Sequence, residues 1–291
     1  MNLDRHLQFK ERVAATFRPL EHTPAGSFPV FGTLSNEYKT SPAAIGSVNY
    51  PTPTTAGYFG TAAVDMWHRS VHSFLISNSL TTSSPIWSSV SGYYSSHYTV
   101  RGLAHLLGYF HVFNRSALIH LQVGARGGYS CTRVSTSGLI GKEHQLYWML
   151  VKRSPVFATD PIFTNNPVGI NVDESESNHR NLANYADHLC NYPIFKPLDI
   201  EETKARINHI SSIVLEDPPI PQKSKFPDIS SVQLIAYHRL VTFRQILDEV
   251  LVDSNRFWSV HRNPPFATEY MDFQVPEASG LSQMRAAVPQ S

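Results

Sequence analysis

The sequence has few cysteines, few charged residues and no long apolar run. Its 291 residues include two cysteines, Cys131 and Cys190, which lack the spacing of metal ligands, and charged residues make up 16% of the chain. No apolar run approaches the ~18 residues needed to span a membrane. The first residues also lack the basic-then-apolar layout of a secretory signal. We therefore expect a protein of the reducing cytoplasm that has no membrane segment, no metal site and no cofactor.

The motifs of two large enzyme classes are also missing. There is no Gly-x-Ser-x-Gly nucleophile elbow of the kind found in serine hydrolases, and no Walker-type phosphate loop. A hydrophobic content of 42% still indicates a folded protein with a sizeable core. The formal net charge of +1 argues against a protein that coats nucleic acid indiscriminately.

Basic residues are concentrated between Arg101 and Arg153. This segment holds seven lysines and arginines against one acid, Glu143, a net charge of +6. Such an excess is typical of a phosphate-binding surface, but also of a solvated face that acids balance elsewhere in the fold. One of its histidines lies near a predicted helix start, where backbone N–H groups favour anions. The residues that we expect to contact nucleic acid in this segment are Arg126, Arg133, Lys142 and His144.

Helical periodicity dominates the rest of the chain. Apolar residues recur at helical spacing in seven segments, so the predicted fold is mainly α. The predicted helices cover residues 3–17, 61–78, a tyrosine-rich segment ending at Gly108, 142–153, 173–189, 199–214 and 230–252. Residues 18–57 are rich in Pro, Thr, Ser and Gly and are predicted to form a long irregular arm. Four prolines between 216 and 228 indicate a linker or a surface loop.

One segment changes period from helical to alternating. Apolar residues recur at every second position from Ala117 to Val123, and glycines at 124, 127 and 128 surround a turn, after which Tyr129 to Ser135 can return as a second strand. This pattern predicts a β-hairpin inserted at about residues 116–136.

The tyrosine-rich helix combines small residues with groups that can do chemistry. His97, Arg101 and His105 are four residues apart and therefore share one side of the helix, next to Tyr94. Arg101 and His97 are candidate catalytic residues. The alternative is that His97 takes the place of a packing phenylalanine and that His105 is a core histidine.

The order of these elements resembles the HEPN superfamily of four- to five-helix domains. Tyr93-Tyr94 followed by Arg101 and Leu103 is similar to the Tyr-Tyr/Arg helix of that family, and His97 stands where the family usually has Phe. The segment 141–148 is similar to the start of its third helix, and 179–185 (His-Arg-Asn-Leu-Ala-Asn-Tyr) is similar to its fourth. The resemblance covers residues 57–215. Outside it lie 1–56 (helix and arm), 216–275 (linker and C-terminal helix) and 276–291, expected to be a disordered tail.

The resemblance implies a metal-independent endoribonuclease of a toxin or defence system. In such proteins an Arg-x4–6-His motif from both subunits of a dimer forms one cleft, where a histidine takes the 2′-hydroxyl proton and an arginine holds the phosphate. Arg180 and Asn181 match the start of that motif, but Tyr185 occupies the position five on and His188 follows eight residues after Arg180. We expect Arg180 and His188 to be catalytic and Asn181 and Tyr185 to bind nucleic acid, or Arg180 to belong to a packing network.

Three hypotheses follow from the sequence. The first is an RNA-cleaving enzyme that acts as a homodimer or larger homo-oligomer. The second is a catalytically inactive HEPN domain that binds nucleotide, nucleic acid or a protein partner, as the altered Arg-to-His spacing suggests. The third is an oligomeric scaffold in which the arm over residues 18–57 wraps a neighbouring subunit.

Overall fold

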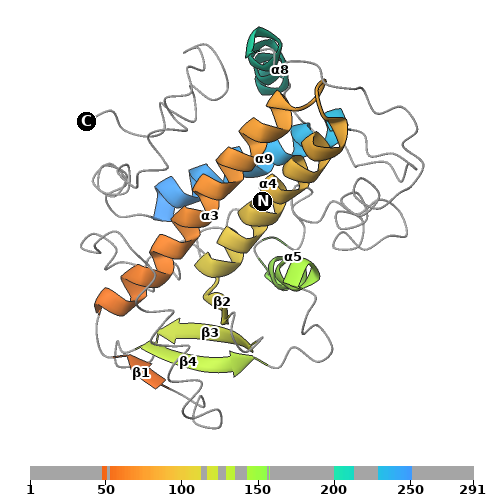
Figure 1. The fold of residues 1–291 in the computed structure, drawn as a ribbon. Coiled ribbons are helices and arrows are strands. Elements are labelled where there is room, and N and C mark those ends of the chain that lie inside the picture. The colour runs from red at the N-terminus through yellow and green to blue at the C-terminus, as the bar shows by residue number, and fades with distance from the viewer. Residues whose placement is uncertain are drawn as a thin grey trace.

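The computed structural model describes residues 48–50, 53–112, 117–123, 129–134, 143–155, 157, 200–212 and 229–250. Helices account for most of these residues, as the periodicity predicts (Figure 1). The helices are α3 (Pro53–Ser79), α4 (Pro85–Leu106), α5 (Glu143–Arg153), α8 (Ile200–Ser212) and α9 (Ile229–Val250). The strands are β1 (Val48–Tyr50), β2 (Tyr109–Val112), β3 (Ala117–Val123) and β4 (Tyr129–Val134).

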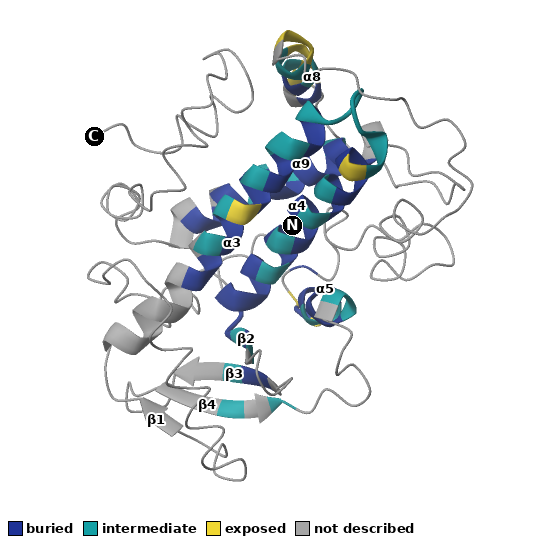
Figure 2. Cartoon of the chain, viewed as in Figure 1, coloured by how far each residue is buried: buried dark blue, intermediate teal, exposed yellow. Residues whose placement is uncertain are grey.

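Helix α4 is the central helix of the described structure. It packs against α3, α5 and α9, and 15 of its 22 residues are buried (Figure 2). A helix buried around most of its circumference lacks a polar outer face, so its polar side chains must find partners inside the protein. Several of them do this in two different places, one facing α3 and α9 and the other facing α5.

Small hydroxyl-bearing residues join α3 to α4. The two helices form an antiparallel pair (Figure 1), connected by residues 80–84. Ser77 Oγ donates to the Ser88 carbonyl at 2.7 Å, and Ser88 Oγ donates to the Ser77 carbonyl at 2.6 Å. Further along, Ser70 Oγ donates to the Ser95 carbonyl at 2.7 Å. Side chains this short allow the backbones to approach closely, and the reciprocal hydrogen bonds fix how the helices are aligned along their axes.

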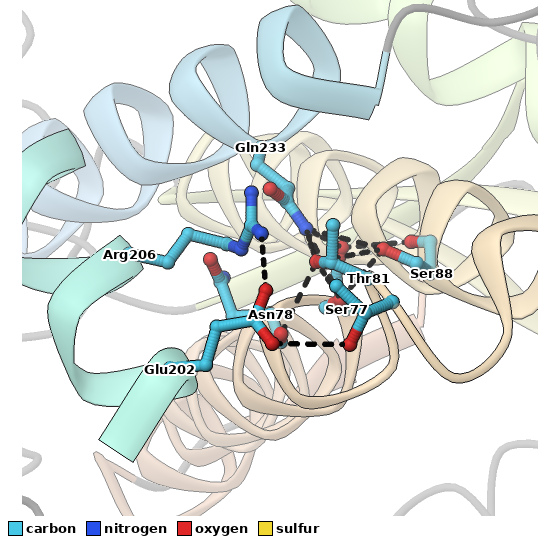
Figure 3. A network of polar contacts seen from close by, with 8 residues as sticks. Ser77, Asn78, Thr81, Ser88, Glu202, Arg206 and Gln233 are labelled. Carbon is cyan, nitrogen blue, oxygen red and sulfur yellow. Dashed lines mark hydrogen bonds and ion pairs between the residues drawn. The ribbon is translucent and has the colours of Figure 1, made fainter. Parts of the chain in front are cut away.

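A buried glutamine attaches α9 to one end of this helix pair. Gln233 is fully buried, and its Nε2 lies 2.7 Å from Thr81 Oγ1, 3.1 Å from the Ser77 carbonyl and 3.1 Å from Ser88 Oγ (Figure 3). The amide nitrogen of glutamine carries two protons, which these oxygens share. One side chain therefore contacts α3, α4 and the turn between them.

Helix α8 covers the same end of the bundle. Ile207 and Ile210 are buried, so the helix packs with this side toward the rest of the protein. On the outer side Glu202 pairs with Arg206 at 3.2 Å and accepts a hydrogen bond from Thr82 at 3.3 Å (Figure 3). Such partly exposed ion pairs contribute little stability, so the isoleucines provide most of the attachment of α8.

Two buried arginines of α9 stack on tryptophans of neighbouring helices. Arg239 Cζ lies 4.6 Å from the ring centroid of Trp148 on α5, and Arg244 Cζ lies 5.1 Å from that of Trp67 on α3. Both arginines are at most 3% exposed. Cation–π contacts are strongest where water is excluded, so these pairs hold α9 between α3 and α5.

The strands form an antiparallel sheet in the order β1-β4-β3-β2, at the end of the bundle opposite α8 (Figure 1). The predicted hairpin is confirmed: β3 pairs with β4 from Leu118 opposite Val134 to Val123 opposite Tyr129. The sheet is larger than predicted, because β2 follows directly after α4 and pairs with β3. Gly108, with φ of 89°, makes the turn between α4 and β2 in a conformation that favours glycine.

The structure corrects one expectation about the arm. Residues 18–57 were expected to be irregular, but Val48–Tyr50 form a strand that pairs with β4, and α3 begins at Pro53 rather than near Thr61. Proline is favoured in the first turn of a helix, where its missing N–H would have no helical partner. The expected boundary at residues 56 and 57 therefore falls inside α3.

Several predicted segments lie outside the described residues. They are the helices at 3–17 and 173–189, the linker at 216–228 and the tail at 276–291. The helices expected at 142–153, 199–214 and 230–252 correspond to α5, α8 and α9. In the part of the chain that the structure describes, every helix is too short or too polar to cross a membrane.

Candidate functional site

Aromatic and imidazole rings gather where α4 meets α5. We call this group the Tyr–His cluster; α4 contributes Tyr93, Tyr94 and His97, and α5 contributes His144 and Tyr147. The three residues of α4 are within one helical turn of each other, and the two of α5 are three residues apart, so each set projects from one part of its helix. The cluster is thus a product of the packing of two helices about fifty residues apart in sequence.

The two histidines of the cluster are in contact. The ring centroids of His97 and His144 are 4.7 Å apart, with an angle of 44° between the rings. His97 is 3% exposed and is stacked at 15° on the ring of Tyr93, whereas His144 is half-buried. His144 Nδ1 lies 2.9 Å from the hydroxyl of Tyr93. Of the two imidazoles, His144 is therefore the one closer to solvent, and His97 lies behind it.

Arg101 adds a positive charge one helical turn beyond His97. Its guanidinium carbon lies 5.2 Å from the ring centroid of Tyr147, and the residue is partly exposed. The tyrosine ring thus supports the arginine from α5, while the same ring lies 6.2 Å from His97. A guanidinium at a partly exposed position is suited to bind an oxyanion such as a phosphate.

His105, the third histidine of the helix side, has a structural role. Its ring is stacked on Phe110 at 4.7 Å and 7°, and its Nδ1 is 2.8 Å from the carbonyl of Tyr109. Burial, assisted by the charge of Arg101 and opposed by the Tyr109 hydrogen bond, lowers the pKa of His105 to about 3. The ring is therefore neutral at physiological pH and donates its Nδ1 proton to the carbonyl, as expected for a core histidine.

The structure brings together three of the residues singled out in the sequence. At the contact between α4 and α5, His97 touches His144, and Arg101, one helical turn further along α4, packs over Tyr147. Arg133 lies in β4 opposite Ile119, in the sheet. The remaining predicted site residues lie outside the described residues: Arg126, Lys142, Arg180, Asn181, Tyr185 and His188.

Sequence reasoning missed Tyr93 and Tyr147 as members of the site. The stripe assigned to the tyrosine-rich helix contains Tyr94 but not Tyr93, which is rotated by about 100° around the axis. In the fold Tyr93 is 1% exposed and faces α5. The sequence did contain an indication of Tyr147: it follows His144 by three residues, and residues three apart share one face of a helix.

The cluster does not have the composition of a metal centre. Among the described residues, no three histidine, cysteine, aspartate or glutamate side chains come together as metal ligands. Its chemical capacities are those of the side chains themselves: an imidazole that can take or give a proton, a phenol bonded to that imidazole, and a guanidinium that can bind an anion.

Comparison with protein-family models, with curated proteins and with solved structures finds no match to this chain. The likeness to the HEPN superfamily and the function that it implies therefore stay predictions.

Proposed function

We propose that this chain is a HEPN-like, metal-independent endoribonuclease of a toxin or defence system. The observation that carries the proposal is a pair of contacts between α4 and α5, His97 with His144 and Arg101 with Tyr147. They place three residues singled out from sequence alone at one helix contact. In this proposal His144 exchanges protons with the RNA, Arg101 binds the scissile phosphate, and His97 lies against the His144 ring from within the protein.

The proposed reaction uses a nucleophile that the RNA already contains. His144 takes the proton of a 2′-hydroxyl, and the freed oxygen attacks the adjacent phosphorus. The bond from phosphorus to the 5′-oxygen breaks, and that oxygen receives the proton held by the imidazole. The products are a 2′,3′-cyclic phosphate and a 5′-hydroxyl. Arg101 stabilises the charge that builds on the phosphate oxygens during this step.

The experiment is incubation of the purified chain with a labelled RNA, with and without a chelator. We expect cleavage in both conditions, a cyclic phosphate at the new 3′ end, and no cleavage of DNA of the same sequence. Removal of a proton-transfer group typically costs about 10²–10⁴-fold in rate, and removal of a donor that stabilises the developing charge costs about 10²–10³-fold. His144→Gln and Arg101→Gln should therefore each lower the rate by at least about 10²-fold. No cleavage by the wild-type protein, or equal cleavage by the variants, would remove the proposal.

Matched controls come from α8, which lies at the end of the bundle opposite the sheet (Figure 1). His209 and Arg206 are a histidine and an arginine of that helix, whose main contacts in the described part of the chain are with α3 and α9. His209→Gln and Arg206→Gln should leave the cleavage rate unchanged. Arg180→Ala tests the predicted motif residue outside the described part of the chain, and should lower the rate as Arg101→Gln does.

The burial of His97 favours a second candidate function, a HEPN-like domain that binds RNA or a nucleotide without cleaving it. A histidine 3% exposed contributes packing more readily than proton transfer. This candidate predicts RNA binding that Arg101→Gln weakens, with no cyclic phosphate product. For either function we propose that the protein is a cytoplasmic homodimer. Sedimentation of the purified chain tests the oligomeric state directly.

A further inference from the structure

Tyr93 is the residue of the Tyr–His cluster that bonds directly to the imidazole of His144. Its hydroxyl lies 2.9 Å from His144 Nδ1, and the side chain is 1% exposed. The side chain is buried, and its position on the central helix α4 is fixed by packing against α5. The hydrogen bond is therefore built into the contact between the two helices.

A hydrogen bond at one ring nitrogen determines what the other ring nitrogen can do. A neutral imidazole carries one proton, and in free histidine the tautomer with that proton on Nε2 predominates. A histidine that takes a proton through Nε2 must instead carry its own proton on Nδ1, with an acceptor there to hold it. The phenol oxygen of a tyrosine can be that acceptor.

We propose that Tyr93 is a positioning residue for His144: its phenol oxygen accepts the Nδ1 proton, so that Nε2 presents a lone pair to the substrate. This inference rests on the proposed function, for which it names the reacting nitrogen. After proton uptake at Nε2, the same hydrogen bond stabilises the imidazolium that forms. Tyr93 touches His144 and not the RNA, as an orienting carboxylate does in a hydrolase triad.

The neighbouring rings hold this geometry in place. His97 is stacked on Tyr93 at 15° and lies 4.7 Å from His144, so it packs against both partners of the hydrogen bond. Rotation of the His144 ring about its χ2 angle would separate Nδ1 from the phenol. The pair is thus constrained by packing as well as by the hydrogen bond.

The chain offers a matched control in the adjacent tyrosine. The ring centroids of Tyr93 and Tyr94 both lie 5.8 Å from that of His144. Tyr94 meets the imidazole edge-on, and within the described structure its hydroxyl makes no hydrogen bond to it. Tyr93→Phe and Tyr94→Phe therefore remove one hydroxyl each at equal ring distance, and only the first removes the bond to Nδ1.

The first measurement is the tautomer of His144, read from nitrogen-15 chemical shifts of the ring in the full chain. We expect the Nδ1–H tautomer in the wild-type protein and in Tyr94→Phe, and a shift toward the Nε2–H tautomer in Tyr93→Phe. An Nε2–H tautomer in the wild-type protein would overturn the inference without the need for any variant.

The second measurement is RNA cleavage by the same three proteins. Loss of a partner that orients a functional histidine costs about 10–100-fold where it has been measured at metal-bound histidines. We expect a loss of this size for Tyr93→Phe and a clearly smaller loss for Tyr94→Phe, which keeps the hydrogen bond to Nδ1. Equal rates in all three proteins would overturn the positioning role. If the wild-type protein cleaves no RNA, the proposed function fails, while the tautomer still decides which atom of His144 the phenol holds.

Discussion

Gly102 of α4 is the position at which the packing of the bundle makes its sharpest prediction. A Cβ atom at this position would lie 2.3 Å from Cζ and 2.5 Å from Cε1 of Phe243 on α9, and 3.2 Å from Cβ of Met66 on α3. Carbon atoms in contact are normally about 3.5–4.0 Å apart. Phe243 and Gly102 are both buried, so the ring has no open space into which it can move.

The free energy of unfolding of Gly102→Ala reflects two opposing terms. Alanine is favoured over glycine inside a helix by ~1 kcal/mol. Extra volume in a well-packed core costs about 1–3 kcal/mol, and displacement of a buried ring by more than an ångström lies at the upper end of that range. We therefore expect Gly102→Ala to lower the free energy of unfolding by about 2 kcal/mol.

Urea unfolding followed by circular dichroism measures this difference. Phe243→Leu removes the ring atoms that clash, so in that background Gly102→Ala should become neutral or stabilising, by up to ~1 kcal/mol. Gly92→Ala is a milder case, because its closest contact is Val232 Cγ1 at 2.8 Å. It should destabilise less than Gly102→Ala. A stabilising Gly102→Ala, or the same loss in the Phe243→Leu background, would refute the packing argument.

Two further predictions concern buried polar groups. Because the pKa of His105 is lowered to about 3 from an ordinary value of 6.5, the unfolded chain binds a proton between these pH values that the folded chain does not. Titration of His105 therefore leaves the free energy of unfolding unaffected above pH 6.5 and lowers it by about 1.4 kcal/mol per pH unit below that pH. In denaturant titrations at several pH values, His105→Gln should flatten this dependence, and His209→Gln should not. Gln233→Glu places a carboxylate against the Ser77 carbonyl, where the wild-type Nε2 donor lies at 3.1 Å. This variant should lower thermal stability more at pH 8 than at pH 5. Gln233→Leu should lower stability by about 1–3 kcal/mol, and this loss should not depend on pH.

The sequence predicted the helices best where apolar periodicity was strong. The stripe of α9 is an example: Val232, Ile235, Leu240, Phe243 and Leu247 recur at helical spacing, and all are buried. The hairpin was visible for a similar reason, since its two strands alternate in polarity and are close in sequence. These elements are specified by residues that are neighbours along the chain.

Elements that depend on distant residues were not predicted. Strand β1 has three residues and exists because Val48 pairs with Cys131, more than eighty positions away. The start of α3 was hidden by Pro53 and Gly57, which normally mark loops, although tertiary contacts can outweigh such local preferences. Neither strand β1 nor the start of α3 can be predicted from the pattern of neighbouring residues alone.

The candidate site likewise has a part that local sequence predicts and a part that depends on distant residues. His97 and Arg101 stood out because they share a helix side, and His144 because it opens a predicted helix. The hydrogen bond between the Tyr93 hydroxyl and His144 Nδ1 depends on how α4 and α5 are oriented about their axes, which their separate sequences do not specify. A rotation of either helix about its axis by one residue, about 100°, would move these side chains out of contact with each other.

The burial of α4 on almost every side constrains how such a site can change. A substitution on α4 is felt by α3, α5 and α9 together, so few side chains there can be exchanged without loss of stability. Helix α5 buries one side, which includes Tyr147 and Trp148, and leaves His144, Gln145 and Met149 only half-buried. New ligand preferences can therefore arise on α5 at little cost to the fold, while α4 provides the constant half of the site.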